Sequence, residues 1–366
     1  MKLSRLSAVA LFSALAFAPG SLQRAFAQSV PEIPFDGDVN FLKLPVNMYL
    51  GEPSGVAINS KKHIFVFNRG NTSGPAYGAA AAQLLEFGPD GKFIREIGKN
   101  LYAWSFAHDV RIDKNDNIWA IDKGSDMIIE FNPEGRVIMV FGRKTEASDE
   151  NAHPWEHPTP PRPATPGQFR QPTDVAWNLD GDIFISDGYI NSRVAVYDKN
   201  GVWKTSFGTP GNGPGQFNTV HGIANDAQGN MYVADRGNKR IQVFDPKGTL
   251  LRQITIDTTA PPGLMPWMGE LPNMSAPNNT MKPGAPWTVC ITPGPTQYLY
   301  TSDSFPGRVY KFTLDGKLVG QLGHVGRQAK EFGWIHQIAC PSENELYVAE
   351  ILNWRVQKLT LHPAGK

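Results

Sequence analysis

The chain has 366 residues, of which 41% are hydrophobic, so it is long enough for one large domain and too apolar for a disordered chain. Its 35 basic and 34 acidic residues give a formal net charge of +1, which argues against nucleic acid or another polyanion as a partner. The 36 glycines and 30 prolines favour frequent turns and argue against long helices.

The first segment has the features of a secretory signal peptide. Two basic residues precede a mostly apolar run from Leu6 to Ala18, and an A-x-A cleavage pattern ends at Ala27. The apolar run is too short to span a membrane, although a membrane anchor remains the alternative interpretation. We therefore expect residues 1–27 to be removed, the chain to be exported to the periplasm or the extracellular space, and the mature protein to make no contact with the membrane.

A strand pattern recurs six times in the rest of the chain. The first strands of the six copies occupy Pro53–Ile58, Ala107–Ile112, Pro172–Trp177, Val220–Asn225, Pro286–Ile291 and Ile335–Cys340. A second strand such as "IFVFNRG", a third such as "QLLEFGPDGK" and a glycine-containing turn into a fourth strand follow the first one. A four-stranded unit repeated about every 40 to 50 residues is typical of a propeller blade. The sequence therefore predicts an all-β fold, a six-bladed β-propeller over residues 49–366.

The sixth copy ends near Leu361 without a fourth strand. Residues 28–48 form an N-terminal segment before the first copy, and the stretch from Phe41 to Tyr49 is our candidate for the missing strand. Pairing the two ends of the chain in one blade would close the ring and remove exposed strand edges.

One position of the first strand, two residues before a Val or Ile, varies between the copies. It holds Ser54, His108, Thr173, His221, Trp287 and His336. Alternate blades of a six-bladed ring are about 120° apart, and the first strand of each blade is the innermost one. The three histidines should therefore converge on the central channel and leave room for a fourth ligand, as in a catalytic zinc site. A hydrogen-bonded ring of histidines that binds an anion is the alternative.

A second column of residues follows the Asn, Asp or Glu near the end of each second strand. It holds Arg69, Lys123, Gly188, Arg236, Ser304 and Ile351. We expect Arg69 and Arg236 to bind a substrate carboxylate at the mouth of the channel, with structural ion pairs as the alternative for each. Tyr189 lies at the same end of its blade, and a neighbouring arginine or a metal-bound anion would shift the pKa of its phenol and suit it to act as a general base.

The repeated units also resemble those of a known family. The units around "MYVADRGNKRIQVFD" resemble NHL repeats, and "FNRG", "AHDV", "QPTDVA", "SDGYINSRV", "VHGIA" and "IHQI" closely resemble peptidyl-α-hydroxyglycine α-amidating lyases. The similarity covers roughly Pro53 to Leu361. It implies a catalytic zinc held by His108, His221 and His336, with Tyr189 as the catalytic base.

The resemblance also implies a substrate and a reaction. Arg69 and Arg236 would lie around the tyrosine and a peptide that ends in α-hydroxyglycine, and cleavage of its N–Cα bond would give a peptide amide and glyoxylate. Members of the family hold a structural calcium through an aspartate that follows the third zinc histidine and through two backbone carbonyls. Here these positions are Gln337, Val56 and Val110. Calcium prefers carboxylates, so with a glutamine at this position the sequence does not decide whether calcium binds.

Two other functions stay open. A related metal-dependent propeller enzyme, such as a hydrolase or a lactonase, would keep the same histidines, and a binding propeller without chemistry would need none of them. The two cysteines, Cys290 and Cys340, are free to pair in an oxidising compartment, but the sequence does not show that they do.

Overall fold

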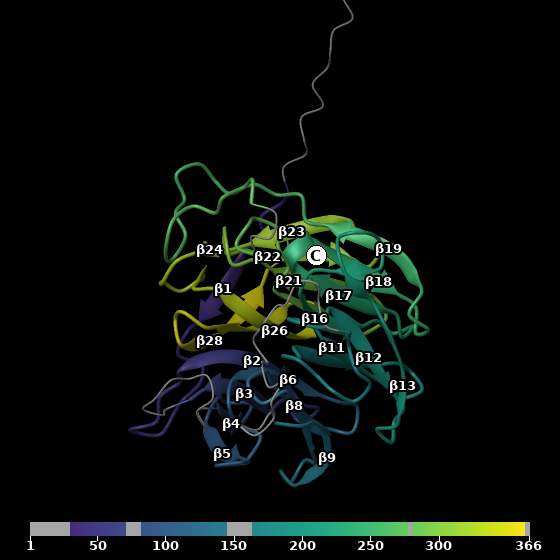
Figure 1. Ribbon diagram of the computed structural model, residues 1–366. Coiled ribbons are helices and arrows are strands. Elements are labelled where there is room, and N and C mark those ends of the chain that lie inside the picture. Colours follow the sequence, from purple (N-terminus) through teal and green to yellow (C-terminus); the bar gives the residue numbers. More distant parts are fainter. Residues whose placement is uncertain (1–29, 71–81, 145–162, 277–279, 363–366) are drawn as a thin grey trace, which may run out of the picture.

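The computed structural model describes residues 30–70, 82–144, 163–276 and 280–362. Six four-stranded sheets, arranged as the blades of a propeller, are found in these residues (Figure 1). This arrangement confirms the predicted all-β, six-bladed fold. The signal-peptide prediction for residues 1–27 lies outside the described part of the chain.

Each blade is antiparallel, and its strands follow the order of the chain except at the end of the ring. Blades 1 and 2 contain β2 (Glu52–Ile58), β3 (Ile64–Arg69), β4 (Ala82–Phe87), β5 (Phe93–Ile97), then β6 (Ala107–Ile112), β7 (Ile118–Asp122), β8 (Met127–Phe131) and β9 (Val137–Gly142). Blades 3 and 4 contain β10 (Asp174–Trp177), β11 (Ile183–Asp187), β12 (Arg193–Tyr197), β13 (Trp203–Phe207), then β16 (Val220–Asn225), β17 (Met231–Asp235), β18 (Arg240–Phe244) and β19 (Leu250–Thr255). Blade 5 contains β20 (Thr288–Ile291), β21 (Tyr298–Ser302), β22 (Val309–Thr313) and β23 (Leu318–Leu322). Blade 6 contains β26 (Ile335–Ser342), β27 (Glu345–Glu350), β28 (Arg355–Leu361) and β1 (Phe35–Asp38).

The few remaining elements are short. Two-stranded parallel sheets pair β14 (Thr209–Pro210) with β15 (Gln216–Phe217) and β24 (His324–Val325) with β25 (Glu331–Phe332). A single 3₁₀ turn, η1 (Arg236–Asn238), follows β17. No helix in the described part of the chain has the length and apolar character needed to span a membrane.

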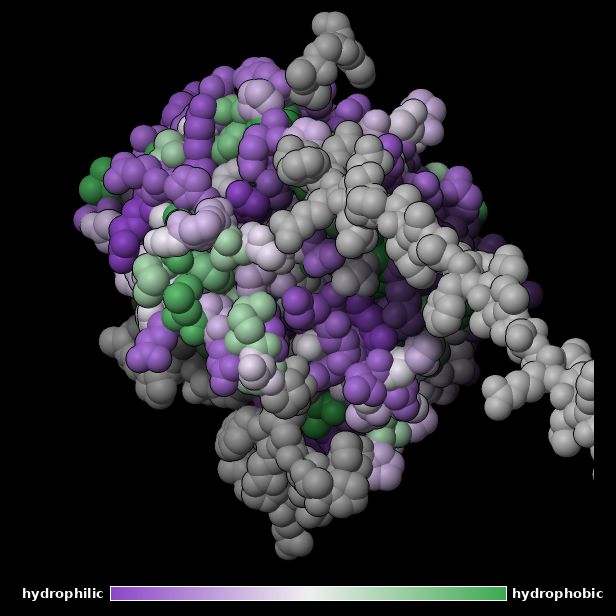
Figure 2. Space-filling model, turned by 90° about the horizontal axis from the view of Figure 1, so that it is seen from above, coloured by the Kyte–Doolittle hydropathy of each residue, from purple (hydrophilic) through white to green (hydrophobic). Residues whose placement is uncertain are grey.

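The hydrophobic core lies between the blades. One buried cluster joins side chains of blade 1, such as Phe67 and Leu84, to side chains of blade 2, such as Ile118 and Ile129. Five further clusters join the other neighbouring blades of the described ring. Both faces of each blade are therefore packed against the neighbouring blades, and this packing fixes the inner strands around the channel. On the outer surface seen in Figure 2, hydrophilic residues dominate, and hydrophobic residues form small patches.

The ring closes in blade 6, where β1 pairs with β28 in the register Phe35↔Leu361. The closing strand is therefore Phe35–Asp38, and the stretch from Phe41 to Tyr49 that the sequence suggested follows it. In that stretch Phe41 and Leu42 pack against the cluster between blades 6 and 1. Its apolar pattern thus reflects packing against two finished blades rather than pairing within one of them.

Candidate metal centre

The three histidines of the alternating column lie on the inner strands β6, β16 and β26. At each of them the pairing register with the next strand shifts, between Ala107 and Asp109 in β6 and at the matching places in β16 and β26. Such bulges leave one residue out of the ladder and redirect its side chain. The local strand irregularity therefore turns each imidazole away from the regular pleat and into the channel.

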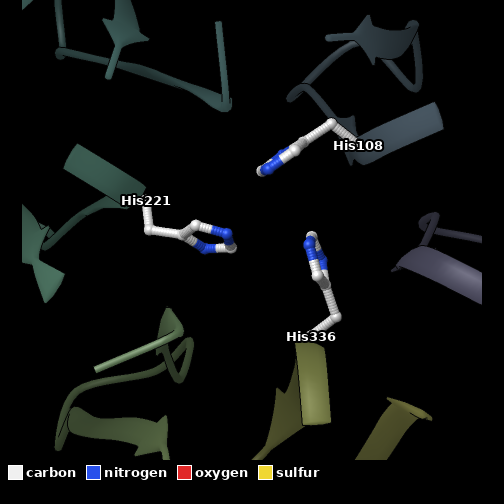
Figure 3. Close-up of side chains that lie close together, drawn as sticks. All are labelled: His108, His221 and His336. Carbon is white, nitrogen blue, oxygen red and sulfur yellow. The ribbon is translucent and has the colours of Figure 1, made fainter. Parts of the chain in front are cut away.

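The imidazole rings meet at the channel axis (Figure 3). One ligand atom from each of His108, His221 and His336 lies within 4.8 Å of the other two. Their ring centroids are 4.7 to 4.9 Å apart, and none of the three residues is more than 3% exposed. The convergence predicted from the repeat is therefore present in the fold.

Hydrogen bonds to the next blade set the orientation of each ring. The Nδ1 atoms lie 2.7 Å from the Thr173 carbonyl for His108, 2.6 Å from the Trp287 carbonyl for His221 and 2.7 Å from the Ser54 carbonyl for His336. The three carbonyls belong to the non-histidine residues of the same column. A carbonyl only accepts, so Nδ1 carries the proton and the Nε2 lone pair is left for a ligand.

The electrostatics of this cluster favour neutral imidazoles. Burial lowers the pKa of each of the three histidines well below its usual value, and neighbouring positive charges from Arg69, Arg236 or Lys123 lower it further. The Nε2 atom of His108 is buried and has no hydrogen-bond partner among the described residues. Three neutral, converging nitrogen donors, one of them unsatisfied, fit a zinc ion or another late first-row divalent metal. The cluster can therefore hold a metal ion.

Tyr189 lies beside the histidines, on the loop after β11. Its hydroxyl oxygen is 3.2 Å from His221 Nε2 and 3.5 Å from Arg236 Nη1. The preceding Gly188 makes this approach feasible, because a Cβ there would lie 1.7 Å from the Val220 carbonyl oxygen. Burial raises the pKa of the Tyr189 phenol, but the charges of Arg236 and Lys123 outweigh it and bring the pKa below the usual value.

The two arginines of the second column have different surroundings. Arg236 is 5% exposed, its guanidinium carbon lies 4.0 Å from the centroid of the Trp287 ring, and no carboxylate pairs with it among the described residues. Arg69 is paired with Glu52 at 2.5 Å and donates to the Ala107 carbonyl. Arg236 therefore has its charge available for an anion in the channel, whereas the charge of Arg69 is paired with Glu52.

Lys123 is a residue of the site that our sequence reasoning did not single out. Its Nζ atom lies 3.8 Å from the centroid of the Tyr189 ring, and burial lowers its pKa, opposed by the charge of Tyr189. It follows the aspartate at the end of β7, at the same repeat position as Arg69 and Arg236. That shared position was the available signal, and it places three cations from blades 1, 2 and 4 around one tyrosine.

Of the residues implied for calcium, Val56, Val110 and Gln337, the glutamine takes part in a hydrogen-bond network. The Gln337 side-chain nitrogen donates to both carboxylate oxygens of Asp109 at 2.7 Å, and its oxygen accepts from the Thr288 hydroxyl and from the backbone of Ile338. A calcium ion would have to displace these hydrogen bonds. We therefore assign no role to calcium.

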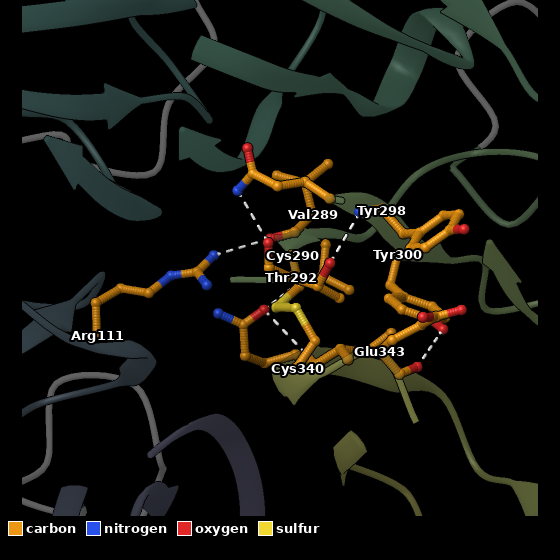
Figure 4. The surroundings of a disulfide bond; sticks show 12 residues. Arg111, Val289, Cys290, Thr292, Tyr298, Tyr300, Cys340 and Glu343 are labelled. Atoms are coloured by element: carbon orange, nitrogen blue, oxygen red, sulfur yellow. Dashed lines mark hydrogen bonds between the residues drawn. A yellow bond between two sulfur atoms is a disulfide. The ribbon is translucent and has the colours of Figure 1, made fainter. Parts of the chain in front are cut away.

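Arg111 supplies a positive charge close to Asp109 and Asp174. Arg111 of β6 forms two hydrogen bonds with the Asp174 carboxylate, at 2.8 and 2.5 Å, and also donates to the Ile223 and Val289 carbonyls. Its guanidinium thus connects blade 2 to blades 3, 4 and 5. Close beside it, Cys290 of β20 and Cys340 of β26 form a disulfide between blades 5 and 6 (Figure 4).

Comparisons with known proteins agree with this architecture. Residues 169–265 match a family model described as a 6-bladed beta-propeller. Among solved structures, the virginiamycin B lyase from Staphylococcus aureus superposes with a TM-score of 0.54 at 13% identity, over 90% of this chain and 100% of that chain. At this identity the likeness shows the fold alone. The chain is a six-bladed β-propeller.

Its relatives in sequence include proteins named as amidating enzymes. The chain is 29% identical over 232 residues to peptidyl-glycine alpha-amidating monooxygenase B of Xenopus laevis, which covers 57% of this chain and 25% of that protein. It is 28% identical over 212 residues to the probable peptidyl-alpha-hydroxyglycine alpha-amidating lyase of Caenorhabditis elegans, covering 53% of this chain and 56% of that protein. A match of 28% over 225 residues to human NHL repeat-containing protein 3, covering 57% of this chain and 56% of that protein, supports the NHL-type repeat. The chain thus spans between a quarter and somewhat over half of the length of these relatives.

Proposed function

We propose that this protein is a zinc-dependent lyase that cleaves the N–Cα bond of a C-terminal α-hydroxyglycine and releases an amide and glyoxylate. The observation that carries the proposal is the convergence of three imidazole Nε2 atoms beside the Tyr189 hydroxyl and the Arg236 guanidinium. The names of the relatives point to the same chemistry.

The reaction needs only a proton transfer and a bond cleavage. The α-hydroxyl oxygen loses its proton and forms the aldehyde double bond, while the electron pair of the N–Cα bond moves to the nitrogen, which gains a proton. A zinc ion held by the three Nε2 atoms would act as a Lewis acid toward the hydroxyl and carboxylate oxygens of the substrate. No oxidant is required.

The side chains around the cluster suit the remaining tasks. Tyr189 would take the proton from the hydroxyl oxygen and return it to the nitrogen, because its own oxygen lies 3.2 Å from His221 Nε2 and therefore next to any ligand of the cluster. Arg236 would bind the substrate carboxylate, since it is buried without a carboxylate of its own. Lys123 would hold the tyrosine ring through its charge.

We also propose that the protein is exported and that its substrate is a peptide or a small N-acyl compound that ends in α-hydroxyglycine with a free carboxylate. The signal-peptide pattern of residues 1–27 supports export, and so does the disulfide between Cys290 and Cys340, a bond that persists in oxidising compartments. Detection of the mature chain, beginning after Ala27, in the periplasm or the medium would test the export.

Metal analysis combined with a glyoxylate assay tests the lyase activity. We expect about one zinc per purified chain, release of glyoxylate from N-benzoyl-α-hydroxyglycine, and near-complete loss of activity in Tyr189→Phe with zinc retained. His324→Ala, which removes an exposed histidine outside the cluster, serves as the matched control for the histidine variants. A folded, zinc-loaded protein that makes no glyoxylate would refute the lyase and favour a hydrolase or lactonase, whereas a chain without metal would favour a binding propeller.

A further inference from the structure

A cavity away from the histidines is lined by residues of blades 2 to 5, most of them from blades 2 and 3. The histidines stand near the beginning of their inner strands, whereas this cavity is lined by the ends of inner strands, including Ile112, Trp177 and Ile291. Its volume of ≈ 950 Å³ lies within the range of small-molecule sites, about 300 to 1,000 Å³. None of the three histidines lines it.

A buried glutamate in the wall of this cavity lacks the partners that its counterpart in the neighbouring blade has. Glu130 of β8 and Glu86 of β4 occupy the same repeat position and are 6% and 5% exposed. Glu86 is bound by His63 at 2.7 Å and by Arg95 at 2.6 Å. The blade of Glu86 therefore surrounds this carboxylate with two basic groups.

In blade 2 both basic groups are replaced by uncharged ones. The register pairs Glu86 with Arg95 in blade 1 and Glu130 with Met139 in blade 2. The residue before the second strand changes from His63 to Asn117, whose amide donates a hydrogen bond of 2.9 Å to Glu130. No cation pairs with Glu130 in the described parts of the chain.

The cations of the same cavity are engaged or exposed. Arg111 is bound to Asp174, and Lys114 and Lys199 are exposed at the rim. Burial raises the pKa of Glu130 to about 7, assisted by the charge of Asp113, as expected for a carboxyl group without a cationic partner. A buried carboxyl group without a cationic partner either takes up a proton or pairs with a cation from outside.

We propose that this cavity binds a small organic cation, whose ammonium group forms an ion pair with Glu130 as the Arg95 guanidinium does with Glu86. Trp177 and Trp119, with ring centroids 5.4 Å apart, line the same cavity and offer apolar and π surface to the alkyl part and the charge. The site is separate from the histidine cluster and does not depend on the proposed lyase reaction.

Titration calorimetry of the full-length protein with n-butylammonium tests the site, with n-butanol as the uncharged probe of the same shape. We expect saturable binding of the ammonium only, at least tenfold weaker in Glu130→Gln. The Asn117 amide can donate to a glutamine oxygen, so this variant should fold. Met139→Arg should place a guanidinium where blade 1 has Arg95 and also weaken binding at least tenfold.

Glu134→Gln is the matched control, because it removes an exposed negative charge from the same blade. It should bind n-butylammonium as the wild type does. The proposal is overturned if the wild type shows no saturable binding, if n-butanol binds equally well, or if Glu130→Gln and Met139→Arg both bind like the wild type. Zinc content and glyoxylate release, measured in parallel, report separately on the histidine site.

Discussion

Two neighbouring layers of the central channel use consecutive residues of the same inner strands and have opposite characters. The histidine layer, made of His108, His221 and His336, points three neutral nitrogens at one another and leaves at least one of them without a partner. The network layer follows it along the strands and contains Asp109, Arg111, Asp174, Thr288 and Gln337. Its side chains come from blades 2, 3, 5 and 6 and bond to one another, and Arg111 also donates to the Ile223 carbonyl of blade 4.

The difference favours the histidine layer as the place where a ligand binds. Buried polar atoms in folded proteins are nearly always hydrogen-bonded, so an exception needs an explanation. In the network layer the carboxyl, guanidinium and amide groups hydrogen-bond to one another, although burial and the charge of Asp174 raise the pKa of Asp109 well above its ordinary value. The histidine layer becomes satisfied only when something binds between its rings. The fold thus places the candidate metal centre directly beside a hydrogen-bond network that connects the blades.

Removal of one of the three histidine side chains should have the largest effect on metal binding and activity. We expect His108→Ala to lower the zinc content to near zero and to reduce glyoxylate release at least ~1,000-fold, which corresponds to about 4 kcal/mol of transition-state stabilisation. The free energy of unfolding without metal should fall by about 1–3 kcal/mol, because the substitution leaves the buried Thr173 carbonyl without its hydrogen bond. A variant that still binds zinc stoichiometrically would contradict the assignment of the histidine layer.

Disruption of the network layer should have the reverse signature. Arg111→Met leaves the Asp174 carboxylate buried without its cation, and loss of one partner of a buried pair costs about 3–5 kcal/mol. Urea unfolding should show this loss, while the folded variant keeps its zinc. The double variant Arg111→Met/Asp174→Asn should recover part of the stability. Recovery by added calcium alone would instead show that the layer is a cation site after all.

The sequence predicted the histidine layer well and the network layer poorly. Blade number and the alternation of the histidines follow from radial repetition, because a repeat position has one height in the ring. The use of Gln337 depends on its bonds to Asp109 of blade 2 and Thr288 of blade 5, which lie far from it in the sequence. The column of cations was visible, but the direction of Lys123 toward Tyr189 depends on how two loops pack. The pairing of the cysteines depended on a distance that no local pattern encodes.

Removal of the disulfide should affect the connection between blades less than disruption of the network layer does. It connects blade 5 to blade 6, the blade that joins the two ends of the chain, across a sequence separation of 50 residues. We expect Cys290→Ser/Cys340→Ser to lower the free energy of unfolding by about 2–4 kcal/mol, since the cross-link restricts the unfolded chain. Comparison of urea unfolding under oxidising conditions checks this, and Ser125→Ala, a buried serine in another blade, provides the control. If a reducing agent lowered the free energy of unfolding of the double variant and of the wild type equally, the disulfide would not be the cause of the stability difference.

The smallest effect concerns Glu130, the buried carboxyl group in the wall of the cavity. The pKa of Glu130 is raised from the ordinary value of 4.5 to about 7, so the folded protein binds its proton more tightly than the unfolded chain. This contribution to stability is present below pH 4.5 and is lost as the pH rises through 7. We expect the difference in unfolding free energy between wild type and Glu130→Gln to change by about 2 kcal/mol between pH 5 and 8, allowing for partial solvent screening. A saturating organic cation should reduce this change, because an ion pair lowers the pKa of the carboxyl group in the folded state. A difference that is constant with pH would mean that Glu130 already has a cationic partner.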